Sequence, residues 1–587
     1  MFKIKYLSEV TMRLKILSIV AVLCCSTDLF PQKMGDAYAL DINNVYMPLN
    51  GRGVLAAVNV PPNGSGGQFA GNVFLFSGGF FLSGYSNGQL WANAVASASL
   101  VEDYLQGTFG NPYNPDAQLY KLRSDDPPFG QSWQDWSDAV TLGADFYDGD
   151  ENGIYVPEDK VGPNGEPMNG QWDSWEDRPD ILGDETLWCV YHDGVPSSQR
   201  RWNTVEPQGI EIRQTVFVYS SVDELKDIIF IRYRIKNTGM VADTMNEVYF
   251  GVWDDPDLGG AQDDLVGCDT LLQSGFTYND GADPLYGNNP PSFFQSFLEG
   301  PRVYIPGETF VDNNGNGIYD EGIDTPLDTA FVHHGQEIGV TIYPGAKNQT
   351  LSSSIEYING DPNLMDPIIA FEARNYMLGL NRIGQLPDPC NWTYGQVRGG
   401  VNCSEVNPYF WYSGDPVTNY GWISTFAGDK RQMQNIGPFE LDTDEEYEIF
   451  VAYSVGQGTS ALSSITEGRV SAVTSKKLYN SNFDTLSVVS VEESETENIP
   501  QAFILNQNYP NPFNPSTIIS WQSPVGSHQT LKIYDVLGNE VATLVDEYKP
   551  AGSYEVEWDA SKYSSGVYFY KLQVGSFSEI KKMMLLR

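Results

Sequence analysis

"IEIRQTVFVYSSVDELKDIIFIRYRIKNTG", residues 210–239, contains two runs of β-branched and aromatic residues on either side of a polar segment. Several apolar residues alternate with polar ones, as the two faces of a β-sheet require. The second run ends in Asn-Thr-Gly, which favours a turn. We therefore predict an all-β fold, and the continuation to Tyr249 predicts a hairpin with "KNTGMVADT" as its turn.

Comparable strands recur throughout a large region, residues 27–484, of one or two subdomains. Hydrophobic residues make up 41% of the chain and aromatic residues 13%, which is too apolar for disorder, and 57 glycines and 35 prolines disfavour long helices. We expect a large β-sandwich-type region with long loops, in which residues 226–249 resemble an immunoglobulin-like or fibronectin-like sheet. One helix is predicted over 461–479, with an apolar side formed by Leu462, Ile465, Val470, Val473 and Leu478.

The charge of the chain restricts its partners. Its 76 acidic residues against 34 Lys and Arg give a formal net charge of -42. Such a chain repels the phosphates of nucleic acids and anionic membranes and attracts divalent cations. We expect no nucleic-acid partner.

The N-terminus has the pattern of a secretory signal peptide, residues 1–26. Basic residues precede an apolar run from Ile16 to Leu23, and small residues follow. A second start at Met12, and a lipoprotein acylated at Cys24 or Cys25, are alternatives. No other stretch has the length and apolarity to span a bilayer, so we expect no transmembrane segment in the mature chain.

A second boundary lies near the C-terminus. Residues 485–498 are acidic and serine-rich, which is typical of a linker. Residues 499–587 then read as short strands with clear turns, which predicts a small immunoglobulin-like β-sandwich. Pro510, Pro512 and Pro515 at its start fix the backbone and remove hydrogen-bond donors, so this entry segment cannot extend a sheet.

The ordered motifs of this last module carry a family resemblance. "NYPNPFNPST", "IYDVLGNEVATLV", "AGSYEVEWDA", "SSGVYFYKLQVG" and "KKMMLL" resemble, in order and spacing, the type A C-terminal sorting domain of the bacterial type IX secretion system. The resemblance implies export across the inner membrane and then the outer membrane, to the cell surface or beyond. It also implies two partners, the secretion machinery and a sortase that removes the module, and frequent attachment to surface lipopolysaccharide.

Two loops of the large region have the oxygen-ligand spacing of calcium loops of the EF-hand kind. "DGDENGIYVPED" places Asp148, Asp150, Asn152, Gly153 and Asp159 at positions 1, 3, 5, 6 and 12. "DNNGNGIYDEGID" places Asp312, Asn314, Asn316, Gly317 and Asp320 at positions 1, 3, 5, 6 and 9. Position 12 of this second loop is Ile323, so Glu321 or Asp324 would have to substitute. We expect Ca²⁺ at both loops; the alternative is a polar turn that needs no ion.

Two further groups are candidates for a structural role. "WDDPDLGGAQDDLVGCDT" gathers six aspartates, which are costly together unless they are solvated or bind a cation. Of the four cysteines outside the signal peptide, Cys390 and Cys403 flank a short polar loop, and in an exported protein we expect them to form a disulfide.

Catalytic patterns are weak. Ser86 in "GYSNG" lies in an Asn-Gly turn between strands, and His333–His334 lacks the H-E-x-x-H spacing of zinc proteases. We therefore predict a secreted, structural or adhesive protein stabilised by calcium. The alternatives are a carbohydrate-active or other hydrolase with a carboxylate pair, and a surface module that binds a polymer, such as extracellular polysaccharide, or a nutrient.

Overall fold

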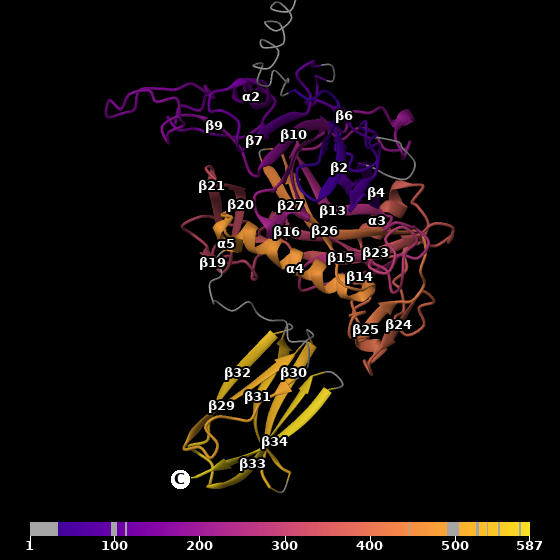
Figure 1. Ribbon diagram of the computed structural model, residues 1–587, viewed down its shortest axis with the longest axis vertical. Coiled ribbons are helices and arrows are strands. Elements are labelled where there is room, and N and C mark those ends of the chain that lie inside the picture. Colours follow the sequence, from indigo (N-terminus) through magenta and orange to yellow (C-terminus); the bar gives the residue numbers. More distant parts are fainter. Residues whose placement is uncertain are drawn as a thin grey trace, which may run out of the picture.

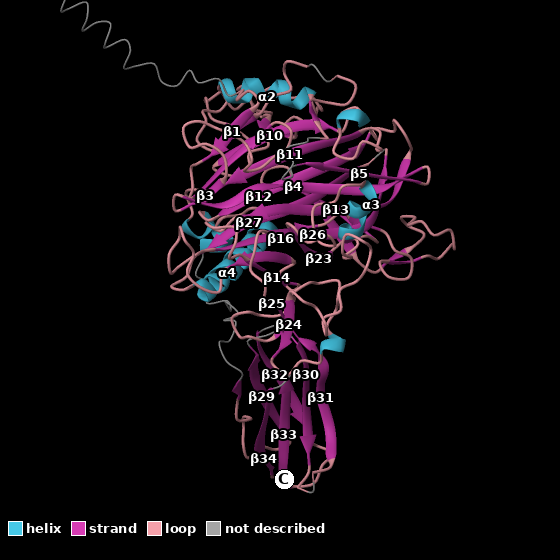
Figure 2. Ribbon diagram, turned by 90° about the vertical axis from the view of Figure 1, so that its right-hand side faces the viewer, coloured by secondary structure: helices cyan, strands magenta, loops and turns pink. Residues whose placement is uncertain are grey.

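The computed structural model describes residues 33–95, 103–111, 114–443, 445–489, 504–523, 527–536, 538–549, 552–574 and 577–586. The predicted signal peptide and residues 490–498 of the predicted linker lie outside these ranges. Strands dominate the described residues and helices lie at their periphery, so the predicted all-β class is confirmed (Figure 1, Figure 2).

Two large antiparallel sheets form the region from residue 33 to residue 489. The first has the order β1-β2-β3-β4-β13-β26-β23, and β5 pairs with β4. Its strands are β1 (Ala37–Leu40), β2 (Val45–Asn50), β3 (Gly67–Phe69), β4 (Asn72–Ser86), β5 (Gln89–Val95), β13 (Thr244–Pro256), β23 (Leu351–Ile358) and β26 (Lys430–Asp442).

The second sheet has the order β14-β15-β16-β27-β12-β11-β10-β6, and β7 pairs with β10. Its strands are β6 (Leu105–Gln106), β7 (Tyr120–Arg123), β10 (Glu185–His192), β11 (Ile210–Val218), β12 (Ile228–Asn237), β14 (Leu265–Asp269), β15 (Ser274–Tyr278), β16 (Ser292–Glu299) and β27 (Glu446–Gly456).

The two sheets pack face to face around a shared apolar core. Tyr233 of β12 contacts Phe80 of β4 and Phe250 of β13, with ring centroids 5.2 and 5.3 Å apart. Such contacts bury aromatic area from both sheets, which is the main stabilising contribution in a sandwich.

The predicted hairpin over residues 226–249 is wrong. β12 pairs with β11 and β27 in the second sheet, whereas β13 pairs with β4 and β26 in the first. The connection "KNTGMVADT" therefore carries the chain across the roughly 10 Å between two sheets. Both edges of each strand are occupied by other partners, so the two strands have no free edges with which to pair.

The last two long strands of the region lie inside their sheets. β26 lies between β13 and β23, and β27 lies between β16 and β12. Helix α4 (Ala461–Asn480) follows them and packs on β27 and β16.

Helix α4 confirms the predicted helix, but not the predicted face. Val470 and Val473 are 56% and 45% exposed. The buried face consists instead of small residues together with three larger ones: Ala461, Ser464, Ile465, Gly468, Ala472, Ser475, Leu478 and Tyr479. A Cβ atom at Gly468 would lie 2.4 Å from a ring carbon of Phe294, so close packing on β16 selects small residues over apolar ones.

Other helices were not predicted. They are α2 (Gln131–Thr141), α3 (Ala370–Met377) and the short α5 (Leu486–Val489). Trp133 and Trp136 of α2 are buried in a separate apolar cluster with Trp188 of β10. Tryptophan is a residue typical of strands, but here two tryptophans form the buried face of a helix.

Small two-stranded sheets project from the sandwich. They are β8 (Phe146–Tyr147) with β9 (Arg178–Pro179), β17 (Arg302–Val303) with β22 (Lys347–Asn348), β18 (Phe310–Val311) with β19 (Thr325–Pro326), β20 (Thr329–Gly335) with β21 (Gly339–Pro344), and β24 (Gly395–Arg398) with β25 (Gly421–Ser424). The loops predicted to bind calcium lie at β8–β9 and β18–β19.

Residues 504–586 form a separate small sandwich with its own core. One sheet has the order β28-β29-β32 and the other β31-β30-β33-β34. The strands are β28 (Ile504–Leu505), β29 (Ser516–Ser523), β30 (Ser527–Tyr534), β31 (Glu540–Lys549), β32 (Gly552–Asp559), β33 (Gly566–Val574) and β34 (Phe577–Leu585). Among the described residues, none of these strands pairs with a strand of the large region (Figure 1).

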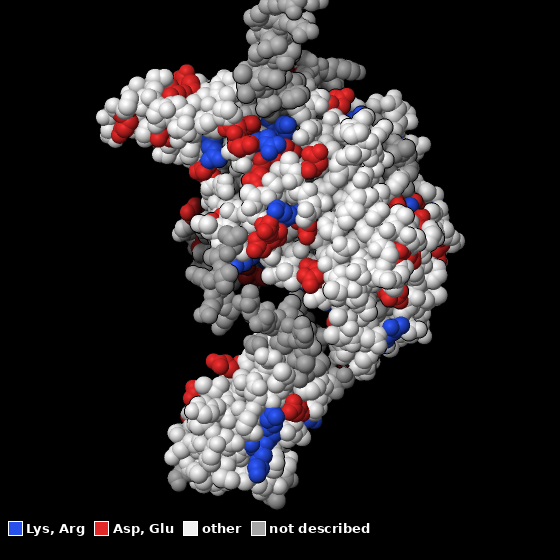
Figure 3. All heavy atoms as spheres, viewed as in Figure 1, with Lys and Arg blue, Asp and Glu red and all other residues white. Residues whose placement is uncertain are grey.

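The proline segment is held against this small sandwich by hydrogen bonds. The Tyr570 hydroxyl accepts from the backbone nitrogen of Asn508 at 2.8 Å and donates to the Asn506 carbonyl at 2.7 Å. The apolar positions of the C-terminal tail, Met583 and Leu585, are buried in β34. Lys532 of β30 lies directly opposite Lys571 of β33, and Figure 3 shows a row of basic side chains on this module.

Candidate functional site

The first predicted calcium loop has the expected turn. The Asp148 carboxylate accepts from the backbone nitrogens of Asn152 at 3.1 Å and Gly153 at 2.7 Å. Gly153 has a φ of 75°, the left-handed conformation that the turn requires. Oxygens of Asp148 and Asp150 lie within 4.8 Å of each other and of an oxygen of Asp177.

The aspartate that closes this loop, by lying opposite Asp148 and accepting hydrogen bonds from the loop backbone, is Asp177 and not Asp159. β8 pairs with β9 through Tyr147 and Arg178, so Asp148 and Asp177 are the next residues along the same ladder. Asp177 accepts from the backbone nitrogens of Gly149 at 3.2 Å and Val156 at 2.7 Å. Asp159 instead accepts from the backbone nitrogens of Asn169 and Gly170 in a neighbouring turn.

The second loop is built in the same way. Asp312 accepts from the backbone nitrogens of Gly315, Asn316 and Gly317 at 2.6, 3.3 and 2.7 Å, and Gly317 has a φ of 81°. The pairing of Val311 with Thr325 makes Asp312 and Asp324 the next residues along the β18–β19 ladder.

Asp324 is the closing residue of this second loop. It accepts from the backbone nitrogens of Asn313 and Asp320, both at 2.8 Å. Asp324 is buried, whereas Glu321 is exposed, so Asp324 takes the place left by Ile323. Asp320 accepts from the side-chain amides of Asn314 and Asn316 at 2.7 and 2.8 Å.

The two loops fit calcium to different degrees. Only the first brings three carboxylate oxygens within 4.8 Å of one another among the described residues. Lys160 already lies beside it, with its Nζ 2.8 Å from Asp150 and 3.9 Å from Asp177. The hydrogen bond from Lys160 lowers the pKa of Asp150, whereas burial raises the pKa of Asp177. A cation bound at the first loop would have to displace this ammonium group.

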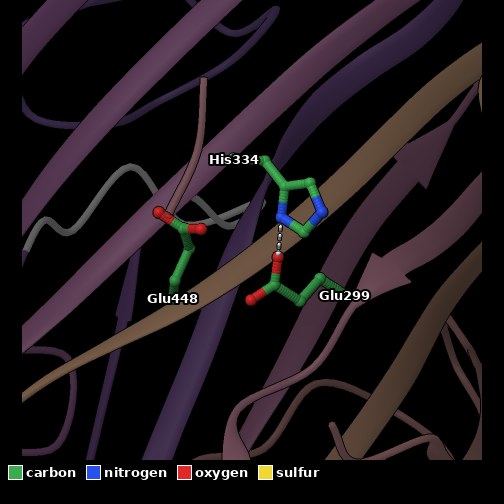
Figure 4. Close-up of side chains that lie close together, drawn as sticks. All are labelled: Glu299, His334 and Glu448. Carbon is green, nitrogen blue, oxygen red and sulfur yellow. Dashed lines mark ion pairs between the residues drawn. The ribbon is translucent and has the colours of Figure 1, made fainter. Parts of the chain in front are cut away.

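A buried cluster that the sequence did not reveal joins three strands. Glu299 of β16, His334 of β20 and Glu448 of β27 are each at most 5% exposed. One ligand-type atom of each lies within 4.8 Å of the others, and His334 Nδ1 lies 3.4 Å from Glu299 Oε2. Figure 4 shows the three side chains converging from their separate strands.

The cluster has protein partners of its own. Tyr479 donates to Glu299 and lies 3.0 Å from His334 Nδ1. Glu448 accepts from Arg234 Nε at 2.6 Å and from the backbone nitrogen of His333 at 2.7 Å. Both oxygens of Glu448 therefore have donors from the protein.

Burial is the largest influence on the pKa values of this cluster. Burial and then the charge of Glu448 raise the pKa of Glu299, and burial lowers the pKa of His334 to about 4. Burial alone would raise the pKa of Glu448, but the charges of Arg234 and Arg232 lower it. The three side chains together link the β20–β21 hairpin to the second sheet. The sequence offered only the pair His333–His334 as a signal.

The six aspartates near β13 do not form one loop. Asp254 is buried between the sheets, where it accepts from Tyr453 at 2.8 Å and from Gln295, and burial raises its pKa. Asp269 pairs with Arg469 at 3.1 Å. Asp264 is buried and accepts from Asn279 at 3.1 Å. These three are each satisfied by the protein.

Asp255 and Asp257 come together with a residue from elsewhere in the chain. Their carboxylate oxygens lie within 4.8 Å of one another and of Asp429. Burial raises the pKa of Asp255 to about 7 and that of Asp257 to about 6. Asp429 lies more than 170 positions away in sequence, so no local pattern indicated it.

The cysteines and the tryptophans are mainly structural. Cys390 and Cys403 form a disulfide next to the β24–β25 hairpin, and their Cα atoms lie 5.0 Å apart. Cys189 and Cys268 are buried free thiols. Trp411 is buried in the core, and Trp392 packs partly against it.

One depression of about 200 Å³ lies between β27, helix α4 and the chain near Asp223. Its acidic lining residues are Asp223, Glu224, Asp227 and Glu467, and no aromatic side chain lines it. Of the helices among the described residues, none combines the length and the apolarity needed to cross a bilayer.

Comparison with known proteins identifies the C-terminal module. Residues 507–586 match the family described as "Secretion system C-terminal sorting domain". The chain thus carries a type IX secretion sorting domain, which directs secretion to the cell surface or the extracellular space. No curated protein matches the chain.

Matches among solved structures are distant. They include a polysaccharide lyase (7% identity, 64% of this chain, 34% of that chain, TM-score 0.19), the adhesin domain of Epf from Streptococcus pyogenes (7%, 68%, 90%, 0.14) and dimeric latent PorU from Porphyromonas gingivalis (10%, 68%, 31%, 0.13). The chain spans about a third of the length of the lyase. At these TM-scores the similarities carry no argument about function.

Proposed function

We propose that the large region is a structural or adhesive protein of the cell surface, stabilised by calcium, that the C-terminal module delivers by type IX secretion. The observation that carries this proposal is the pair of equivalent loops closed by Asp177 and Asp324. Each gathers acidic and amide oxygens on an exposed two-stranded ladder, where calcium of the extracellular medium has access.

The arrangement of the carboxylates supports a structural role over a hydrolytic one. The acidic residues that come together are partnered by Lys160, Arg234 or Arg431, and the depression near Asp223 lacks the aromatic floor of a sugar-binding cleft. A sandwich filled with apolar side chains and braced by loops suits a load-bearing or binding surface.

The sorting domain supplies the partners of this proposal. We infer that the secretion machinery recognises residues 507–586, that a sortase cleaves before them, and that the mature protein is attached to lipopolysaccharide or contacts extracellular polysaccharide. The acidic surface of the large region does not suit anionic partners unless cations bridge the two (Figure 3).

The test uses a producing bacterium and a strain that lacks the whole chain. We expect the protein at the surface of the wild-type cells, and weaker attachment of the deletion strain to surfaces or to other cells. The purified protein should release no products from a panel of bacterial and plant polysaccharides. Two results together would overturn this proposal in favour of a hydrolase. The purified protein would release products that an Asp255→Asn variant does not release, and the deletion strain would attach as well as the wild type.

A further inference from the structure

Three carboxylates meet at one end of the first large sheet. Asp255 lies near the end of β13, Asp257 follows that strand, and Asp429 immediately precedes β26. β13 and β26 are antiparallel neighbours, with Asp254 opposite Gln432, so the end of one strand lies beside the start of the other. Oxygens of the three carboxylates therefore lie within 4.8 Å of one another.

The protein supplies too little positive charge at this point. Arg431 lies 3.2 Å from Asp255 and 2.5 Å from Asp429, so one guanidinium serves two carboxylates. The carboxylate of Asp257 accepts no hydrogen bond from the described residues. Three carboxylates and one guanidinium leave an excess of two negative charges, and Asp366 adds a further negative charge nearby.

A second observation concerns the hydrogen-bonding capacity of Asp255. Its side chain is only 3% exposed, and one oxygen, Oδ2, faces Arg431. The other oxygen, Oδ1, is buried and has no hydrogen-bond partner. A buried carboxylate oxygen without a donor is costly, because it has lost water and gained nothing in exchange.

We propose that Asp255, Asp257 and Asp429 form a binding site for a hard divalent cation of the calcium class. A divalent ion balances the two excess charges and supplies a partner for the unpaired oxygens. All the protein ligands are oxygens, which favours calcium, magnesium or manganese over zinc. Asp257 and Asp429 are only half-buried, so water molecules can complete the coordination. The bound ion would tie the end of β13 to the start of β26, independently of the two loops.

The experiment counts the ions bound to the full chain. Protein stripped with a chelator is titrated with Ca²⁺ and examined by native mass spectrometry in an Asp148→Asn/Asp312→Asn background, which removes both loops from the count. We expect one remaining ion. Asp257→Asn should abolish it or weaken its binding about tenfold or more. Asp263→Asn, in the same connection but outside the group, should leave it unchanged.

Two further measurements keep the test decisive. Asp257→Asn should melt no lower than its parent in chelator, because it removes a repelling charge that has no partner. Should it misfold, Asp429→Asn replaces it. Crystals of the unmodified chain soaked in Mn²⁺ should show an anomalous peak between the three carboxylates. An unchanged ion count in a folded Asp257→Asn variant, or no peak at this position, would show that protons and not a cation neutralise the group.

Discussion

Asp177 and Asp324 hold equivalent places in two loops that lie far apart in the sequence. Each accepts from the backbone nitrogen of the loop's second residue and of its ninth: Gly149 and Val156 for Asp177, and Asn313 and Asp320 for Asp324. Each also immediately precedes the second strand of a two-stranded ladder. The same turn therefore occurs twice in the chain. In the first loop, a long segment separates the turn from its closing aspartate, Asp177.

The first prediction concerns the loop that Asp177 closes. Calcium at ten times its dissociation constant should raise the free energy of unfolding by about 1.4 kcal/mol for each site that binds only the folded chain. Asp177→Asn should remove this gain at the first loop, and the matched Asp159→Asn should retain it. The measurement is the difference between thermal melts in calcium and in chelator. Equal differences for the two variants would contradict the assignment of Asp177.

The second loop offers an independent comparison. Asp324→Asn should reduce the calcium-dependent shift in melting temperature, because its carboxylate is buried in the loop. Glu321→Gln should not, because Glu321 is exposed. Melts of the two variants with and without calcium decide between the candidates for the missing twelfth position. A loss of the shift in the Glu321 variant alone would reverse the choice.

The third prediction concerns pH and His334. Burial lowers the pKa of His334 to about 4, against about 6.5 in the unfolded chain. Between these values the unfolded chain binds a proton that the folded chain does not, so stability falls as the pH is lowered from 6.5 to 4. The total loss in the free energy of unfolding is about 3 kcal/mol at most.

His334→Gln removes this contribution. The difference in unfolding free energy between wild type and variant should therefore change by about 3 kcal/mol between pH 7 and pH 4. Denaturant titrations across this range measure it. Parallel pH profiles for the two proteins would mean that His334 titrates alike in the folded and unfolded chains.

The fourth prediction concerns the bridge between Cys390 and Cys403. Closing a loop of this length should stabilise the large region by roughly 3 kcal/mol on the chain-entropy account. A Cys390→Ser/Cys403→Ser variant should lose about this amount, and reducing agent should change the wild type alone. Mass spectrometry of a non-reduced digest checks the pairing directly. Two free thiols in freshly exported protein would rule it out.

The fifth prediction concerns export. The described residues of the C-terminal sandwich share no strand pairing with the large region, so deletion of residues 499–587 should leave the large region folded. The truncated chain should accumulate in the periplasm, and the mature surface form should lack the C-terminal module. Fractionation with an antibody to the large region measures both. Surface display of the truncated chain would show that the sorting domain is dispensable.

Much of this structure could be predicted from local sequence patterns. The turns at Gly153 and Gly317, helix α4 and the strands of the small sandwich each depend on residues close in sequence, and each was predictable. The buried face of α4 was not, because contact with Phe294 of β16 selects small residues there, whatever the apolar periodicity of the helix.

Features that depend on distant pairing were missed. Asp177 joins its loop through the β8–β9 ladder, and Asp429 reaches Asp255 through the pairing of β13 with β26. The cluster of Glu299, His334 and Glu448 draws on three separate strands. The spacing of residues in the sequence predicts which side chains are neighbours along a helix or a turn. It does not predict which strands pair with each other. The predicted hairpin at 226–249 failed for the same reason.

The interior positions of β26 and β27 also determine when this protein can fold. Neither large sheet is complete until residues 430–456 have been synthesised, and Glu448 must find Arg234 across 214 positions. Contacts so distant in sequence form slowly, so the chain remains unstructured well after its N-terminus has emerged. That delay favours passage through a narrow translocation pore.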